Sequence, residues 1–188
     1  AHLHYLLILL SIQCHRAAVK DLIKSIKSLN GKFVAFLPYI FPVLINVTRQ
    51  SEQSLRDFMF QQFRELVQTI GQHIRDYLQD TVKLMLDFWD TPSLGGILLL
   101  AEAISEAVND EFRVYLPILV PQMLRELSRE RMLVRVMPHK VIQAFEAFGT
   151  SMDDYLYLVV PAVLAMIERE DTSLQTALTA LNQLRKMS

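Results

Sequence analysis

Apolar residues recur along this chain at the spacing of an α-helix rather than a β-strand. Between residues 36 and 70 they form two amphipathic segments, with apolar positions three or four residues apart. The first segment contains Phe36, Leu37, Ile40, Val43, Leu44 and Val47, and the second contains Leu55, Phe58, Met59, Phe63, Leu66, Val67 and Ile70. No alternation of apolar and polar residues persists long enough to indicate a strand. The pattern predicts an all-α protein of about nine helices.

A short apolar phrase recurs along the chain. It reads FLPYIFP at 36–42, YLPILVP at 115–121 and YLYLVVP at 155–161, and the degenerate YLQDTVK occupies the matching place at 77–83. Its leucines are separated by 38 to 41 residues, and we expect Leu116 and Leu156 to be buried at equivalent places. A second signal has nearly the same period, because Gly or Asn recurs every 38 to 40 residues as Gly31, Gly71, Asn109 and Gly149. These residue types suit the left-handed conformation that ends a helix.

Two helices in a period of roughly 40 residues are typical of a HEAT or armadillo solenoid, where each helix pair buries its apolar face against its neighbours. We therefore expect a HEAT-repeat α-solenoid, a right-handed superhelix of about 4.5 repeats, over residues 1–188. Its units are expected at 15–31 (partial), 34–71, 74–109, 112–149 and 152–188. Because the chain has no initiating Met and ends within a repeat, we expect it to be an excerpt of a much larger protein.

Prolines and threonines mark the expected helix starts. Pro38 and Pro117 fall in first turns, where a missing N–H costs nothing. Pro42, Pro121 and Pro161 fall one turn later, where they are expected to bend the helix. Thr91, followed by proline, is predicted to be an N-cap.

Composition adds limits on location and partners. Nineteen basic and twenty acidic residues give a net charge of −1, so no global field attracts nucleic acid, and no nucleic-acid partner is expected. A lone cysteine, Cys14, excludes an internal disulfide and favours a reducing, cytoplasmic compartment. No apolar run approaches the roughly 18 residues that a membrane span needs, so no transmembrane segment is expected.

Candidate catalytic groups do not converge in the sequence. The histidines, His2, His4, His15, His73 and His139, show no metal-ligand spacing. Asp153 and Asp154 precede a predicted helix, where carboxylates cap free N–H groups. Gly95 and Gly96 lack the lysine of a phosphate-binding loop. We therefore expect no catalytic residue, metal or cofactor in this segment, and no enzymatic activity of its own.

Two polar surfaces are candidates for partner binding. Arg16, Lys20, Lys24 and Lys27 share one face of a predicted helix, here called the basic stripe, which would suit an acidic or phosphorylated partner. Asp57, Gln61, Arg64 and Gln68 share the face opposite the apolar residues of a later helix, here called the polar ridge. Second helices of such repeats usually line the concave side, where partners bind. An ordinary solvated face is the alternative interpretation of both surfaces.

Four stretches of the chain resemble a known family. SLRDFMFQQF at 54–63, HIRDYLQDTVKLMLDFW at 73–89, EFRVYLPILVPQML at 111–124 and DDYLYLVVP at 153–161 together resemble the middle HEAT-repeat region of the target of rapamycin (TOR) kinases. The resemblance covers about residues 14–188, with like phrases in like order.

The resemblance implies a segment of a large serine/threonine kinase of the phosphatidylinositol-kinase-related group, which acts in nutrient and growth signalling. Its catalytic domain is expected outside this chain. In that family the HEAT solenoids dock Raptor- or Rictor-type accessory subunits, contribute to dimerisation with a second kinase protomer, and help to receive a Rheb-type GTPase. The complexes are expected in the cytoplasm and at the surface of lysosomal or vacuolar membranes. The alternatives are a segment of another HEAT protein, such as a sister kinase, a karyopherin or a phosphatase scaffold, or a helical enzyme.

Overall fold

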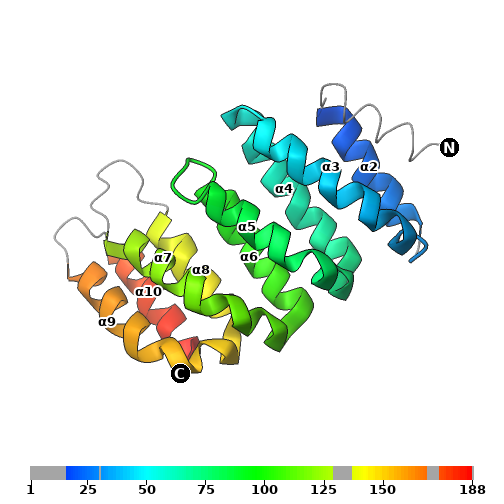
Figure 1. Cartoon of the computed structure of the whole chain (residues 1–188). Helices are drawn as coiled ribbons and strands as arrows, with labels where there is room; N and C mark the ends of the chain where they lie inside the picture. The colour runs from blue at the N-terminus through cyan, green and yellow to red at the C-terminus, as the bar shows by residue number, and fades with distance from the viewer. Residues whose placement is uncertain (1–15, 30, 129–136, 169–173, 188) are drawn as a thin grey trace. The chain divides into compact units, whose positions relative to one another are not determined.

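The computed structural model describes residues 16–29, 31–128, 137–168 and 174–187, and every regular element within these ranges is helical. This confirms the predicted all-α, helical-repeat fold (Figure 1). The chain divides into two compact units, Ala1–Val108 and Asn109–Ser188. The predicted hand of the superhelix and the predicted single array stay predictions.

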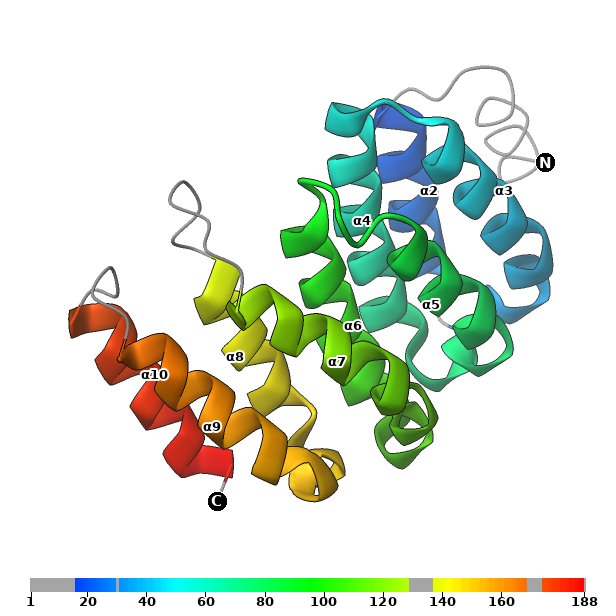
Figure 2. The same ribbon diagram turned by 60° about the vertical axis from the view of Figure 1, so that its left-hand side comes forward.

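The described part of the first unit consists of one helix followed by two helix pairs. They are α2 (Arg16–Ser28), α3 (Leu37–Gln50), α4 (Gln53–Ile70), α5 (Leu78–Asp87) and α6 (Leu94–Val108). Helix α4 packs between α2 and α6, whereas α3 packs on α4 and α5, so the second helices and the first helices form separate layers (Figures 1 and 2). The layer of second helices carries both candidate surfaces.

The described part of the second unit repeats the same pairing. It contains α7 (Leu116–Ser128), α8 (Met137–Ala147), α9 (Leu156–Ile167) and α10 (Leu174–Met187). Helix α7 packs on α9 and α8 on α10, while α7 also contacts α8 and α9 contacts α10. Two first helices therefore lie in one layer and two second helices in the other, as in the first unit (Figure 2).

The predicted helix stops all have positive φ angles, although ψ of −130° places Gly71 outside the αL region that the prediction assumed. The φ angles are +86° at Gly31, +55° at Gly71, +48° at Asn109 and +54° at Gly149. After each stop the chain enters a short 3₁₀ helix that the apolar pattern did not predict: η1 (Val34–Phe36), η2 (Gly71–Tyr77), η3 (Asn109–Tyr115) and η4 (Gly149–Tyr155). These turns connect the end of one repeat to the first helix of the next.

The leucines of the repeated phrase mark the core, with one exception. Leu37, Leu78 and Leu116 are buried, Leu116 completely. Leu156 begins α9 at the equivalent place but is only half-buried, so the expectation of equal burial is wrong for this position. The residues that fill the interior of the second unit from α9 are instead Val159, Val163 and Met166.

Prolines and start signals occupy most of their predicted places. Pro38 lies in the first turn of α3, and Pro42, Pro121 and Pro161 lie inside α3, α7 and α9. Bending by these prolines stays a prediction. Thr91 is not the N-cap of α6, because the helix begins at Leu94 and its first α-helical hydrogen bond runs from Ile97 N–H to the carbonyl of Ser93. The N-cap position therefore belongs to Ser93.

Polar contacts join equivalent positions of neighbouring repeats. Each pairs residues 38 to 41 apart, which is the period of the apolar phrase: Arg16–Ser54, Lys27–Glu65, Arg49–Asp87, Gln53–Ser93, Arg113–Asp154 and Glu146–Lys186. Since none of these residues belongs to the apolar phrase, the contacts are an independent sign of the repeat.

Candidate functional site

The first half of the basic stripe lies against the beginning of α4. Arg16 Nη2 donates a hydrogen bond of 2.9 Å to the carbonyl of Ser54, and the Arg16 guanidinium carbon lies 5.4 Å from the centre of the Phe58 ring. The ammonium of Lys20 lies 5.7 Å from the same ring. Cations at this distance from an aromatic face are attracted to it. These two cations therefore help to join α2 to α4.

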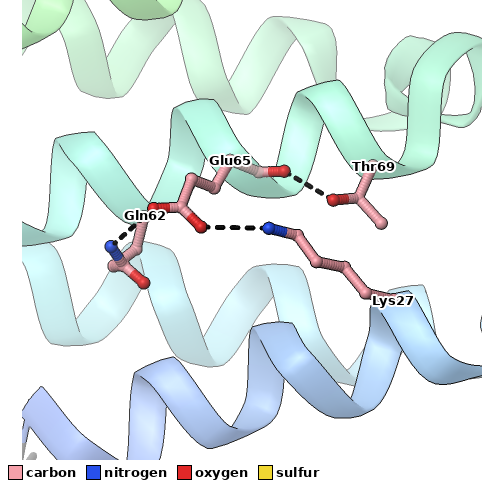
Figure 3. A network of polar contacts seen from close by, with 4 residues as sticks. All are labelled: Lys27, Gln62, Glu65 and Thr69. Carbon is pink, nitrogen blue, oxygen red and sulfur yellow. Dashed lines mark hydrogen bonds and ion pairs between the residues drawn. The ribbon is translucent and has the colours of Figure 1, made fainter.

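The second half of the stripe is divided between the fold and the solvent. Lys27 Nζ lies 3.2 Å from Oε2 of Glu65 on α4, and Glu65 Oε1 accepts a longer hydrogen bond from Gln62 (Figure 3). Thr69 closes this network by donating to the carbonyl of Glu65. Lys24 is 3.9 Å from Asp21, and its side chain is 78% exposed. Of the four predicted cations, Lys20 and Lys24 keep the most freedom to meet a partner.

The polar ridge runs along α4 in the layer of second helices, but its first residue serves the fold. Asp57 Oδ1 accepts hydrogen bonds from Gln53 Nε2 at 2.8 Å and from Ser93 Oγ at 2.6 Å. Gln53 Nε2 also donates to Ser93 Oγ at 2.8 Å, which closes a triangle. Ser93 is buried, so Asp57 ties α4 to the start of α6 and is not available as a free carboxylate.

Ser93 is a residue that sequence reasoning missed. Prediction placed the start of α6 at Thr91, and a search for helix caps that considered both Thr91 and Ser93 would have included it. Arg56 was missed too. Its guanidinium lies 4.1 Å from the centre of the Phe88 ring and donates to the carbonyl of Ser51, so it fixes the turn between α3 and α4 against the end of α5.

The remaining ridge residues face outward. Gln61 and Gln68 are exposed, and Arg64 is half-buried. Arg64 and Gln61 line a hollow of about 280 Å³ together with Glu65 of α4 and with Gly96 and Leu99 of α6. The Nε of Arg64 is buried, and no hydrogen-bond acceptor lies within reach of it among the described residues. This hollow is the part of the ridge whose polar groups the fold leaves unused.

Gly96 lines the hollow at a point where α4 and α6 pack closely together. A Cβ added at Gly96 would lie 3.2 Å from the Cβ of Phe60, so α4 and α6 approach more closely here than a larger residue allows. The prediction that Gly96 lies within a helix is confirmed. The absence of a side chain at Gly96 allows the two second helices α4 and α6 to pack closely.

Predicted catalytic candidates show no convergent chemistry where the structure describes them. Asp154 pairs with Arg113, one repeat earlier, instead of capping α9, whose N-cap residue Tyr155 forms no side-chain cap; the predicted capping role is wrong for Asp154. The hydrogen bond and the charge of Asp154 raise the pKa of Arg113. His73 packs edge-on against Phe33, with ring centres 5.8 Å apart. No group of three metal-binding side chains occurs in the described ranges, and His2, His4, His15 and Cys14 lie outside them.

One stretch has the length and hydropathy of a membrane span by composition alone. It runs over Gly149–Ile167, and 28% of its most apolar window is buried. It combines the 7-residue 3₁₀ helix η4 with the 12-residue helix α9. The predicted absence of a transmembrane segment stays a prediction.

Comparison with known proteins finds relatives that are named as TOR kinases. A family described as Serine/threonine-protein kinase mTOR domain matches residues 3–71. Serine/threonine-protein kinase tor1 of Schizosaccharomyces pombe is 35% identical over 180 residues, which is 93% of this chain and 8% of that protein. Serine/threonine-protein kinase mTor of Drosophila melanogaster is 31% identical over 93% of this chain and 7% of its own length. Serine/threonine-protein kinase TOR of Arabidopsis thaliana is 30% identical over 82% of this chain. The chain thus spans less than a tenth of the first two of these relatives.

Proposed function

Because this chain belongs to the TOR serine/threonine kinases as a homologue of one segment, we propose that it is a non-catalytic scaffold segment of such a kinase. The observation that carries this proposal is that the alignment covers most of this chain but only a small part of each relative. Nearly all of the chain aligns with proteins named as kinases, yet it accounts for only 7 to 8% of their length. Stacked helix pairs suit a scaffold, because they display long surfaces at fixed spacing. The names of these relatives do not support a karyopherin or a phosphatase scaffold.

The proposed partners are the proteins that assemble with such a kinase in nutrient and growth signalling. They are a Raptor- or Rictor-type accessory subunit in TORC1 or TORC2, a second kinase protomer, and a Rheb-type GTPase. The proposed location is the cytoplasm, with peripheral association of the whole complex at lysosomal or vacuolar membranes. Support for protein binding comes from α4, where Gln61, Arg64 and Gln68 face outward while the neighbouring Glu65 is already paired with Lys27.

The proposal is tested in the full-length kinase. One variant combines Gln61→Ala, Arg64→Glu and Gln68→Ala on the ridge, and a second combines Lys20→Glu and Lys24→Glu on the basic stripe. Each is purified through a tag, and the recovered accessory subunits, GTPase and differently tagged second protomer are quantified. A residue central to an interface costs about 2 kcal/mol or more of binding, so loss of at least one partner is expected for the ridge variant.

Intrinsic phosphorylation of a peptide substrate is measured alongside, and it is expected to persist because this segment supplies no catalytic group. If both variants retain every partner, the surfaces are solvated faces, and the segment acts only as a spacer between binding sites on either side.

A further inference from the structure

Arg64 is a cation whose Nε has no hydrogen-bond partner in the described part of the chain. Its side chain is half-buried, its Nε is inaccessible to solvent, and no acceptor for that N–H exists among the described residues. Neighbouring charges are used differently: Lys27 pairs with Glu65, and Arg56 donates to the carbonyl of Ser51. A buried donor without an acceptor is unfavourable, and more so when it is charged. Because Arg64 also lines the hollow, a ligand there would meet a guanidinium that no described residue binds.

The hollow beside Arg64 has room and a defined chemistry. Gln61 offers an exposed amide on one side, and Leu99 of α6 offers an apolar wall on the other. Glu65 also lines the hollow, but Lys27 and Gln62 both contact its carboxylate, at 3.2 and 3.5 Å. The unbalanced charge in the hollow is thus the positive charge of Arg64.

We propose that this hollow receives the carboxylate of an Asp or Glu side chain on a protein partner, with Arg64 as the residue that binds it. The inference rests on the proposed function and names the chemistry of the partner. A guanidinium can bind a carboxylate through its two terminal amino groups by two parallel hydrogen bonds, which does not require access to the buried Nε. The methylene groups of the incoming side chain contact Leu99, and the amide of Gln61 donates to the carboxylate.

A phosphate group fits the hollow less well. Sites for a phosphate dianion usually combine several cations, but Arg64 is the one cation among the described residues that line the hollow, and Lys27 is held by Glu65. A single guanidinium in a concave site that is partly apolar matches a single carboxylate. The occupant is accordingly an acidic segment of a protein and not a phosphopeptide or an anionic membrane.

The test uses the full-length kinase with its bound partners and a zero-length carbodiimide, which joins an amine to a carboxylate. The Arg64→Lys variant keeps the positive charge and places a reactive amine in the hollow. After treatment, peptides that contain position 64 are identified by mass spectrometry. The expected product is a link from this position to an Asp or Glu of another polypeptide. A link between Lys27 and Glu65, which are 3.2 Å apart, serves as the internal control that the reagent reacts and that α2 still packs on α4.

A binding measurement accompanies the cross-linking. Arg64→Gln, which removes the charge but keeps an amide, is expected to weaken recovery of the linked partner about tenfold or more, and Arg64→Lys less. Links from position 64 only to residues of the same chain, with the control link present, would overturn the carboxylate assignment. Equal recovery of all partners by the Arg64→Gln variant would overturn it too. If the triple ridge variant still loses a partner, the proposed scaffold function stands while this inference fails.

Discussion

Arg49 Nη2 lies 3.1 Å from Oδ2 of Asp87, and the two residues are separated by one repeat of 38 positions. Arg49 lies in the last turn of α3 and Asp87 is the last residue of α5, so the pair joins the last turns of two neighbouring first helices. Lys27 and Glu65 do the same for the second helices α2 and α4. Within each unit, neighbouring repeats are thus joined by apolar packing inside and by polar pairs at the surface.

The surface pairs are expected to contribute little stability. Both Arg49 and Asp87 are more than 40% exposed, so solvent screens their attraction. In a double-mutant cycle with Arg49→Ala and Asp87→Ala, the coupling free energy from urea unfolding should be below about 1 kcal/mol and should shrink in 1 M salt. A coupling well above this value, unchanged by salt, would show that the pair is not an exposed ion pair.

Apolar packing is expected to contribute far more, and two equivalent leucines test this. Leu116→Ala removes a completely buried side chain from α7 and should destabilise the chain by about 2 to 5 kcal/mol. Leu156→Ala, at the same place in the next repeat, should cost clearly less because Leu156 is only half-buried. Urea unfolding of the two variants makes the comparison, and equal losses would contradict the burial described for Leu156.

The helix stops with positive φ give a prediction about backbone strain. Gly71 has φ of +55°, and no atom lies within 4 Å of a Cβ placed there, so Gly71→Ala tests conformation without a clash. It should destabilise the chain by about 1 to 3 kcal/mol, and Gly71→Asn by a similar amount, since ψ at Gly71 is −130°, outside the αL region that Asn tolerates. At Asn109, with φ of +48°, Asn109→Gly should leave stability unchanged or raise it. The unfolding temperatures of the three variants test these expectations. Wild-type stability of Gly71→Ala would refute the conformation assigned to Gly71.

Tyr77 gives a prediction about pH. Burial and, secondly, the charge of Asp76 raise the pKa of Tyr77 above that of a free tyrosine, which is 10.0. The folded chain therefore keeps this proton longer than the unfolded chain does, so the stabilisation is complete below pH 10 and is lost as pH rises further. Tyr77→Phe keeps the aromatic stack on Phe41, whose centre lies 4.1 Å from that of Tyr77. The variant should lose less stability than the wild type between pH 10 and 12, as measured by urea midpoints; an identical decline would exclude this role.

The sequence predicted the features that depend only on residues close together along the chain. The period of the apolar residues and the stops at Gly71 and Asn109 follow from helix geometry and from which residues tolerate positive φ, so both could be found in the sequence. Contacts between repeats could not be found in the sequence. The ion pair of Lys27 with Glu65 and the hydrogen bond of Asp57 with Ser93 depend on how α4 is rotated against α2 and α6.

The candidate site shows the same division. Helical spacing correctly placed Gln61, Arg64 and Gln68 together on the outer face of α4, but it also grouped Asp57 with them, which the fold uses internally. Leu156 is less buried than Leu37, Leu78 and Leu116. The position of a residue within the repeat does not determine its burial, which also depends on the residues that pack against it.

The central claim is that the outer part of the ridge serves binding while Asp57 serves the fold. It is tested most directly by comparing Arg64→Glu with Asp57→Ala in two assays, thermal unfolding of the 188-residue chain and recovery of partners by the full-length kinase. Arg64→Glu should leave the unfolding temperature nearly unchanged and reduce partner recovery, because a side chain at this surface contributes little to stability. Asp57→Ala should lower the unfolding temperature, since it leaves the hydroxyl of buried Ser93 without its acceptor, at a cost of about 1 to 3 kcal/mol. Full partner recovery by Arg64→Glu, or an unfolding temperature lowered as much as by Asp57→Ala, would contradict the account.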